Sequence, residues 1–451
     1  MKILILLWPL MFLAYCKMEN QERSASGNVF PFEIHQKLFP NGLNTVTVPY
    51  ESPGIVSFYI IVRAGSREEV EPGKTGFAHF FEHMMFRGTD NYPSETYNAT
   101  LKSIGAAANA NTWLDRTIYH MTGNAEMLEK MFEIESDRFF NLKYSVHDFK
   151  TEAGAVKGEY TKNYASPYMQ LSEKTMATAF EAHTYQHTTM GFWEDVVDMP
   201  NQYEYSLEFF ERFYKPEYTT ILVVGDVTPD RITQLADKYF SDWEKGNYAP
   251  RIPAEPEQSE TRYAHVQNEN FPPYISLNYK SPAFNPQMKD NAALQVISQI
   301  LFSQKSALYK MLVIDEGIAR NLGSNYLFTR DPYLFTVSAT LKKAEDLQHA
   351  KDQIVKGIDD LIQNGVDAQV LDDTKAHIRY SFATSLNSAS SIAESLSYMI
   401  WVTGNPESLN QYYQQVNELT VEDLQKIARK YLDAGKLTIS TISPAAEGGV
   451  S

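Results

Sequence analysis

The residues best suited to chemistry in this sequence are two histidines and a glutamate in the run His79-Phe80-Phe81-Glu82-His83. At about 100° per residue, a helix would place these polar side chains on one stripe. Two imidazoles one turn apart suit Zn²⁺, and the intervening carboxylate is close enough to hold a metal-bound water. The spacing therefore predicts a zinc site with Glu82 as the general base. A helix with two partly buried histidines and a surface acid is the alternative.

A catalytic zinc needs a third protein ligand, and a pair of glutamates further along the chain offers one. Glu152 and Glu159 are seven residues apart, nearly two helical turns, so both carboxylates share a face. One could bind the metal while the other orients an imidazole or a water, and the spacing does not decide which. Because glycine weakens a helix, Gly154 and Gly158 predict a close approach to another helix. Two solvated acids on a charged face are the alternative.

Hydrophobic patterning predicts the elements that must position these side chains. A β-branched and aromatic run at 54–63 is typical of a strand, and a turn around Gly73 leads from it to a helix at 76–86 that contains the histidines. The other helices expected in the first half are 94–104, 125–141, 146–162 and 201–213, and the other strands are 116–122 and 219–224.

The second half closes with the same order of elements as the first. Residues 246–262 contain three prolines and few apolar side chains, which is typical of a linker. After it, a helix at 419–432 and a strand at 437–442 repeat the order at 201–225. We therefore predict an α+β fold of two homologous α/β-sandwich domains, related by duplication. The further strands expected here are 263–266, 274–279, 323–328 and 334–341.

Composition limits the partners and the metal ligands. The 451 residues include 40 basic and 56 acidic side chains, for a formal charge of −16, which argues against nucleic-acid binding and weakly favours basic or neutral partners. The single cysteine excludes an internal disulfide framework and any site built from several thiolates. A metal must therefore be held by histidine and carboxylate side chains.

The chain begins with the features of a bacterial export signal. Lys2 is followed by mostly apolar residues up to Tyr15, a run too short to span a bilayer and suited to the core of a signal peptide. The segment Leu13-Ala14-Tyr15-Cys16 resembles a lipoprotein processing site, although Tyr15 stands where a small residue is usual. We predict a signal peptide at 1–16, lipidation of Cys16, a tether at 17–28 and a periplasmic protein anchored to the outer membrane.

The zinc motif and its surroundings resemble the pitrilysin, or M16, metallopeptidase family, which includes the mitochondrial processing peptidase. That family has His-x-x-Glu-His followed by a second glutamate pair, and 75 residues separate His83 from Glu159 in this sequence. Residues 76–89, 109–112 and 213–226 also fit segments of the family. The resemblance implies that His79, His83 and Glu159 bind one Zn²⁺ per chain, that Glu82 is the base, and that Glu152 supports a ligand.

The resemblance also implies the domains, which are a catalytic domain at 29–245, the linker, a C-terminal domain at 263–445 and a tail at 446–451. Asn109, Ala110, Asn111 and Thr112 fit the family's substrate-binding edge strand, whereas residue type alone favours a turn. An unpaired strand edge can accept an extended peptide. The implied function is a zinc-dependent endopeptidase acting on peptides or unfolded segments. A non-catalytic assembly subunit and a protein that binds peptides without cutting them are the alternatives.

One segment of the second half departs from the family. Members usually have an arginine and a tyrosine there, and Val313 and Arg320 stand at those positions. Tyr326 does not reproduce the spacing and is assigned no catalytic role. The resemblance to two-subunit processing peptidases then predicts a related subunit without zinc that completes the site, with a homodimer as the alternative. The histidines expected to have structural roles are His120, His183 and His187.

Overall fold

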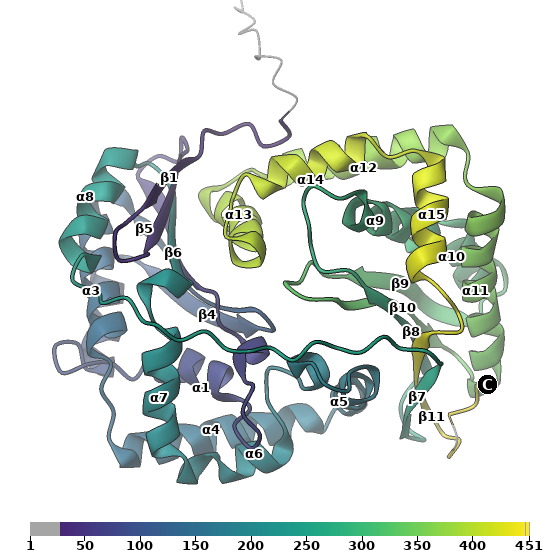
Figure 1. Ribbon diagram of the computed structural model, residues 1–451, viewed down its shortest axis with the longest axis horizontal. Coiled ribbons are helices and arrows are strands. Elements are labelled where there is room, and N and C mark those ends of the chain that lie inside the picture. Colours follow the sequence, from purple (N-terminus) through teal and green to yellow (C-terminus); the bar gives the residue numbers. More distant parts are fainter. Residues whose placement is uncertain (1–27, 447, 451) are drawn as a thin grey trace, which may run out of the picture.

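The computed structural model describes residues 28–446 and 448–450, which form two halves, each built from one sheet and its helices (Figure 1). This mixed arrangement of two sheets and many helices confirms the predicted fold class. The predicted signal peptide, the lipidation site Cys16 and all but the last residue of the tether lie outside the described residues.

The first sheet has six strands in the order β1-β2-β6-β3-β5-β4. β2 and β6 are parallel and the other neighbours are antiparallel. Its strands are β1 (His35–Leu38), β2 (Asn44–Pro49), β3 (Ile55–Val62), β4 (Ala107–Trp113), β5 (Arg116–Asn124) and β6 (Thr219–Gly225).

Both faces of this sheet are buried, which explains the nearly continuous apolar sequence of β3. Phe58 and Ile60 point into a core shared with the helices of the first half, whereas Tyr59 and Ile61 point into a core shared with the second half. Alternate residues of a strand face opposite sides, so a strand covered on both sides needs apolar residues throughout.

The helices of the first half lie mainly over one face of the sheet, where α1, α3, α4, α7 and α8 contribute to a common core. Two helices begin later than predicted, because 3₁₀ turns at Ala125–Met127 and Met199–Asn201 precede α3 and α7. The helices are α1 (Phe77–Met84), α2 (Ser94–Ser103), α3 (Leu128–Asn141), α4 (Val146–Tyr164), α5 (Pro167–Ala179), α6 (Trp193–Asp198), α7 (Tyr203–Phe213) and α8 (Pro229–Phe240).

The second sheet has five strands in the order β7-β11-β8-β10-β9. β9 begins four residues before the predicted strand at 323–328, because a bulge in β9 at Arg320 allows Ala319 to pair with Leu341. The strands are β7 (Arg262–Gln267), β8 (Tyr274–Ser281), β9 (Ala319–Tyr326), β10 (Tyr333–Leu341) and β11 (Leu437–Ser443). The helices are α9 (Lys289–Phe302), α10 (Ala307–Tyr309), α11 (Leu347–Asn364), α12 (Ala368–Ser385), α13 (Ala389–Thr403), α14 (Ser408–Asn417) and α15 (Val421–Tyr431).

Each half lends one helix to the sheet of the other half. α13 packs against β3 and β6, and α5 packs against β7 and β11. Small hydroxyl side chains mark both contacts, since Ser57 Oγ lies 2.8 Å from Ser390 Oγ and Thr175 Oγ1 lies 2.8 Å from Ser440 Oγ. The two halves therefore share their cores.

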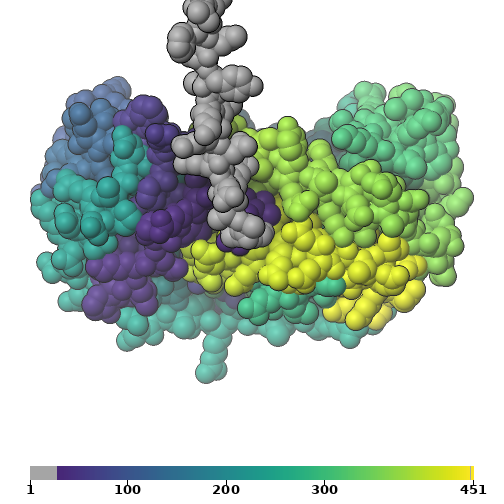
Figure 2. Space-filling view, turned by 90° about the horizontal axis from the view of Figure 1, so that it is seen from above, coloured from purple at the N-terminus to yellow at the C-terminus, as the bar shows by residue number. Residues whose placement is uncertain are grey.

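Further contacts join the halves outside these helices. In Figure 2 the purple N-terminal segment and the yellow-green C-terminal helices meet along one face, where the Phe30 backbone N–H donates to Asn410 at 3.2 Å. The linker has no regular structure between 244 and 261, but the Glu255 carboxylate accepts the backbone N–H groups of residues 181–183. Within residues 28–446 and 448–450, no helix combines the length and apolar character needed to cross a membrane.

Candidate metal centre and active site

Helix α1 holds the two motif histidines, and its start is fixed by two neighbouring segments. Gly76 precedes it with φ at 90°, and a Cβ atom there would lie 2.9 Å from the Met190 carbonyl oxygen, so only glycine fits without a shift. The buried Glu69 carboxylate accepts the N–H groups of Gly76 at 2.9 Å and Ala78 at 2.7 Å. Burial raises the pKa of Glu69 to about 8. This acid satisfies N–H groups that a helix start leaves unpaired.

Helix α4 places Glu152 and Glu159 beside α1. Its first turn is closed by a capping box in which Ser145 and Asp148 each bond to the other's backbone N–H. The Phe149 ring then packs against Phe80 of α1, with ring centroids 5.1 Å apart. The predicted explanation for the glycines is wrong, because Cβ atoms at 154 and 158 would meet nothing within 4 Å among the described residues. Ala153, Val156 and Tyr160 form the packed face instead.

Three predicted ligands converge at this helix pair. The Nε2 atoms of His79 and His83 lie 3.3 Å apart, and Glu159 Oε2 lies 3.3 Å from His83 Nε2 and 3.8 Å from His79 Nε2. Among the described residues, this is the one His, Cys and acid group whose possible ligand atoms all lie within 4.8 Å of one another. Two nitrogens and one carboxylate oxygen in this arrangement fit the donor set of a catalytic zinc, which leaves a position open.

Glu152 sets the orientation of His83. Its Oε1 lies 3.0 Å from His83 Nδ1, and its Oε2 accepts the Arg87 Nε–H. The Nδ1–H that donates to this carboxylate leaves the Nε2 lone pair directed at the ligand cluster. This hydrogen bond raises the pKa of His83. Burial alone would raise the pKa of Glu152, but hydrogen bonds from His83 and Arg87 hold it below its usual value.

His79 is more deeply buried than His83, and this burial lowers its pKa. Its Nδ1 has no hydrogen-bond partner among the described residues. Arg87 and Glu69 are site residues that the sequence interpretation missed. Arg87 follows His83 by one helical turn, a spacing that could have indicated it, whereas Glu69 reaches α1 from a preceding loop and had no such signal.

Glu82 lies at the border of two cavities that open beside the ligand cluster. One, of about 380 Å³, is lined by Glu82 together with His83, Arg87 and Glu152. The other, of about 440 Å³, is lined by Glu82, His79 and Glu159 from the metal side and by Tyr333 from the second half. The Glu82 carboxylate is therefore positioned to act on a group that enters between the ligands and the second half.

The predicted substrate strand is the outer strand of the first sheet. Asn109, Ala110, Asn111 and Thr112 all belong to β4, which within the described residues pairs with β5 alone, so the alternative of a turn is wrong. Asn111 and Thr112 also line the larger of the two cavities, whereas Ala110 is buried. Arg116 donates to the Asn111 carbonyl oxygen at 2.9 Å. The structure thus places a strand edge next to Glu82.

The other histidines lie outside the ligand cluster. The His120 ring stacks on Tyr59 with centroids 5.0 Å apart. His183 Nε2 lies 3.0 Å from Asp331, a residue of the second half. His187 is 3% exposed and its Nδ1 bonds to the Thr188 carbonyl oxygen. These contacts agree with the structural roles predicted for His120 and His183, whereas the Nε2 of His187 has no hydrogen-bond partner among the described residues.

Comparison with known proteins places the chain among peptidases. A family model described as insulinase (peptidase family M16) matches residues 46–191, and one described as the peptidase M16 inactive domain matches residues 202–378. The chain belongs to the M16 peptidase family. The predicted resemblance is thereby confirmed.

Relatives of this M16 chain extend over most of its length. A zinc protease, PqqE, of Helicobacter pylori is 29% identical over 90% of this chain and 91% of its own. A mitochondrial-processing peptidase subunit beta of Caenorhabditis elegans is 22% identical over 92% and 91%. The crystal structure of a protease from Helicobacter pylori matches with a TM-score of 0.85 at 28% identity, over 92% of this chain and all 100% of that one. The periplasmic protease PqqL from Escherichia coli shares the fold, with a TM-score of 0.76 over 92% and 48%.

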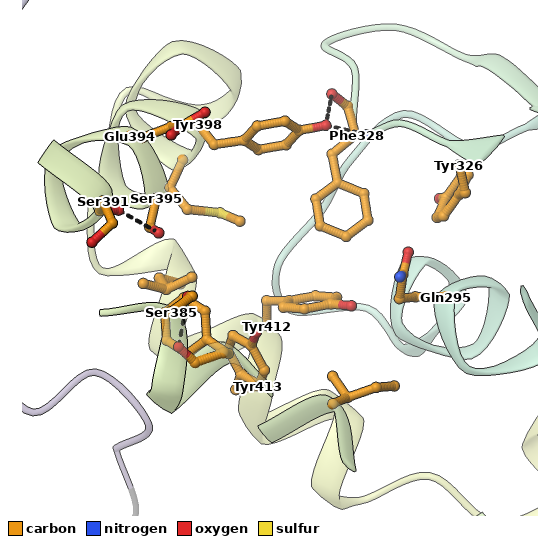
Figure 3. Close-up of a pocket in the computed structure, with 14 residues that line it drawn as sticks. Gln295, Tyr326, Phe328, Ser385, Ser391, Glu394, Ser395, Tyr398, Tyr412 and Tyr413 are labelled. Carbon is orange, nitrogen blue, oxygen red and sulfur yellow. Dashed lines mark hydrogen bonds between the residues drawn. The ribbon is translucent and has the colours of Figure 1, made fainter. Parts of the chain in front are cut away.

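Val313, Arg320 and Tyr326 do not line the cavities of the metal centre, whereas Tyr333 of the second half does. Val313 lies in a π-helical turn at Lys310–Asp315, and Arg320 is exposed on β9. The Tyr326 hydroxyl accepts the Asn291 side-chain N–H at 2.6 Å. As Figure 3 shows, Tyr326 borders a different cavity, of about 470 Å³, with Phe328 and Tyr398.

Proposed function

We propose that this M16 chain is a zinc endopeptidase that hydrolyses peptides or unfolded segments. The observation that supports this most directly is the meeting of His79 Nε2, His83 Nε2 and Glu159 Oε2 beside the Glu82 carboxylate. Relatives named zinc proteases, which match 90% of the chain, support it as well. His79, His83 and Glu159 would hold the metal, which when bound would polarise the scissile carbonyl and acidify water.

The side chains around the metal would then move the protons. Glu82 takes a proton from the attacking water as the new C–O bond forms, and it delivers that proton to the amide nitrogen as the C–N bond breaks. Glu152 accepts a hydrogen bond from the His83 Nδ1–H. This holds His83 in the tautomer whose Nε2 lone pair can bind the metal. No group of the protein becomes covalently attached to the substrate.

The edge of β4 would hold the substrate backbone. An extended peptide can pair with a strand edge through main-chain hydrogen bonds, so that binding does not depend on the peptide's sequence. Asn111 and Thr112 would place such a peptide in the cavity that also contains Glu82 and Glu159. This arrangement suits unfolded segments, because a peptide that pairs with β4 must be extended and must reach the cavity beside Glu82.

Replacement of Glu82 by glutamine tests the assignment. We expect Glu82→Gln to retain zinc, measured as metal content, and to cleave an unstructured peptide about 10²–10⁴-fold more slowly, because the amide cannot accept the proton. Glu126→Gln, at an exposed position, is the matched control and should cleave like the wild type. Full activity in Glu82→Gln would refute the base assignment. A wild-type protein that retains zinc and binds the peptide without cutting it would instead support a peptide-binding function.

We also propose a periplasmic location with a lipid anchor at Cys16 and a related partner subunit. The relative PqqL is described as periplasmic, and Val313 and Arg320 replace the arginine and tyrosine usual in the family. Incorporation of a labelled fatty acid that is lost in Cys16→Ser would support the anchor. A purified single chain that cleaves as fast as a mixture with a related subunit would remove the case for the partner.

A further inference from the structure

A further cavity, of about 520 Å³, lies beside the metal centre and is lined by parts of α4, α5 and the segment 186–194. On α4, Glu159 and Asn163 line the cavity of the metal centre, whereas Tyr160 and Tyr164 line this one. Thr188 borders both cavities. The volume of the cavity lined by Tyr160 and Tyr164 is in the range of sites that bind small molecules. We call it the α4–α5 cavity.

Two buried acceptor atoms in the lining of the α4–α5 cavity have no partner among the described residues, His187 Nε2 and Glu173 Oε1. The Nδ1 of His187 must donate, because its neighbour at 2.9 Å is the Thr188 carbonyl oxygen. Burial lowers the pKa of His187 to about 4, so the ring is neutral at pH 7 and its Nε2 presents a lone pair. Unpaired buried acceptors are rare in folded proteins and indicate a missing donor.

The charge around these acceptors favours a cation. Glu194 also lines the cavity, and its charge acts on both Glu173 and Tyr160. Two lysines lie near these carboxyl groups. Lys174 lines the cavity, but its Nζ donates to the His265 carbonyl oxygen at 2.9 Å, and Lys157 Nζ lies 5.7 Å from the centre of the Trp193 ring. Neither ammonium group forms an ion pair with Glu173 or Glu194 among the described residues. Burial raises the pKa of Glu173 and the Tyr160 hydroxyl lowers it, so a bound cation would stabilise the charged carboxylate.

Aromatic side chains form the remaining walls and suit the apolar part of a ligand. The rings of Tyr160 and Trp193 lie 5.1 Å apart, and the ring of Phe192 lies 5.2 Å from that of His187. Aromatic faces attract cations as well as apolar stems. A metal ion is the wrong occupant, because among the described residues His187 and the two glutamates do not form a group within metal-binding distance.

We infer that the α4–α5 cavity binds a small organic cation, a primary amine or guanidinium on an apolar stem, whose N–H groups donate to His187 Nε2 and to the Glu173 carboxylate. The cavity of Figure 3 gives less indication of a ligand than the α4–α5 cavity, because its hydroxyl groups are largely hydrogen-bonded within the protein. Ser395 donates to the Ser391 carbonyl oxygen at 2.8 Å, and Tyr398 donates to that of Phe328 at 3.3 Å. The inference does not depend on the proposed peptidase activity.

Titration calorimetry of the full chain with 2-phenylethylamine tests this site. We expect binding at millimolar concentration or below, and none with 2-phenylethanol, which has the same apolar stem without the ammonium group. Glu173→Gln keeps the size of the side chain and removes its charge, and His187→Leu removes the acceptor. Each should weaken binding of the amine about tenfold or more, whereas Glu126→Gln should bind it like the wild type.

Several results would overturn the inference. They are a wild-type chain that does not bind the amine, equal binding of amine and alcohol, or Glu173→Gln and His187→Leu variants that fold and bind as the wild type does. Circular dichroism shows whether each variant folds. If both of these variants fail to fold, Glu194→Gln takes their place, and unchanged affinity in that variant would overturn the proposal in the same way.

Discussion

The His83 imidazole is held by two further side chains, and this determines which of its nitrogens can bind a metal. Glu152 accepts the Nδ1–H, and Arg87 donates to the same carboxylate from one turn further along the chain. Without the carboxylate, the ring could turn or carry its proton on Nε2, where it would block the ligand position. Glu152 should therefore affect metal affinity without contacting the metal.

Removal of this carboxylate gives a measurable expectation. We predict that Glu152→Ala binds zinc about 10–100-fold more weakly than the wild type, as expected when the group that orients a metal-bound histidine is lost. Competition with a chelator of known affinity measures this. Glu126→Ala, at an exposed position, should leave the affinity unchanged. Wild-type affinity in Glu152→Ala would show that α1 packing alone orients His83.

At this scale the sequence predicted well what local spacing determines. His79, Glu82 and His83 share a stripe because a helix repeats every 3.6 residues, and Glu152 and Glu159 share a face for the same reason. Glu69 was not predictable, because it reaches α1 through a loop. The glycines of α4 were misread, since their spacing beside the glutamates suggested packing and the structure leaves them facing open space.

At the scale of elements, the first turn of α1 decides where the histidines stand. Gly76 lies in the left-handed region directly before the helix, where a Cβ atom would collide with the Met190 backbone, while Glu69 accepts the N–H groups of Gly76 and Ala78. The helix itself has only eight residues, from Phe77 to Met84, too few to be stable without such contacts. Its position depends on the surrounding loops as much as on its own sequence.

Two glycine replacements distinguish the cost of backbone strain from the cost of a collision with the Met190 carbonyl oxygen. Gly76→Ala should lower the free energy of unfolding by about 3 kcal/mol, because a Cβ atom meets both an unfavourable φ and the Met190 carbonyl oxygen. Gly73→Ala has a similar φ of 80° but nothing within 4 Å, so about 1 kcal/mol is expected. Urea denaturation measures both. Equal losses in the free energy of unfolding would mean that the Met190 segment moves away from the new Cβ atom without a measurable cost.

At the scale of the whole molecule, a buried group of charges joins the first half to the loop before β10. Asp331 of that loop accepts Arg67 Nε–H at 2.6 Å and lies 3.0 Å from His183 Nε2. Its neighbour Arg330 donates to Glu68 at 2.9 Å. Burial alone would raise the pKa of Asp331, but the hydrogen bonds from His183 and Arg67 hold it well below its usual range.

Replacement of Asp331 should reveal this connection and its pH dependence. Because its pKa is lower in the folded state than in the unfolded chain, its contribution is present above about pH 4 and is lost as pH falls further. We expect Asp331→Asn to lower the free energy of unfolding by about 2 kcal/mol at pH 7, and the difference to shrink near pH 3. Urea denaturation at both values checks it, with surface Asp315→Asn as the control. A difference that stays constant with pH would contradict this account.

This long-range organisation was only partly predictable. Repeated order at the ends of the two halves correctly indicated two related sheets, because local patterning is similar in each. The destination of α5 and α13 was not indicated, since an apolar helix face shows that something covers it but not which sheet does. The start of β9 was missed for a similar reason, because the bulge at Arg320 depends on pairing between strands.

The crossing of α5 and α13 makes the two halves inseparable as folding units. A fragment that ends before the linker would contain α5 without β7 and β11, the strands it packs against. In the same fragment, the surface of β3 and β6 that α13 covers would be exposed to solvent. The reverse would hold for a fragment starting at β7. Proteolytic cleavage of the linker should therefore leave the two fragments associated in one complex, and neither fragment should fold independently.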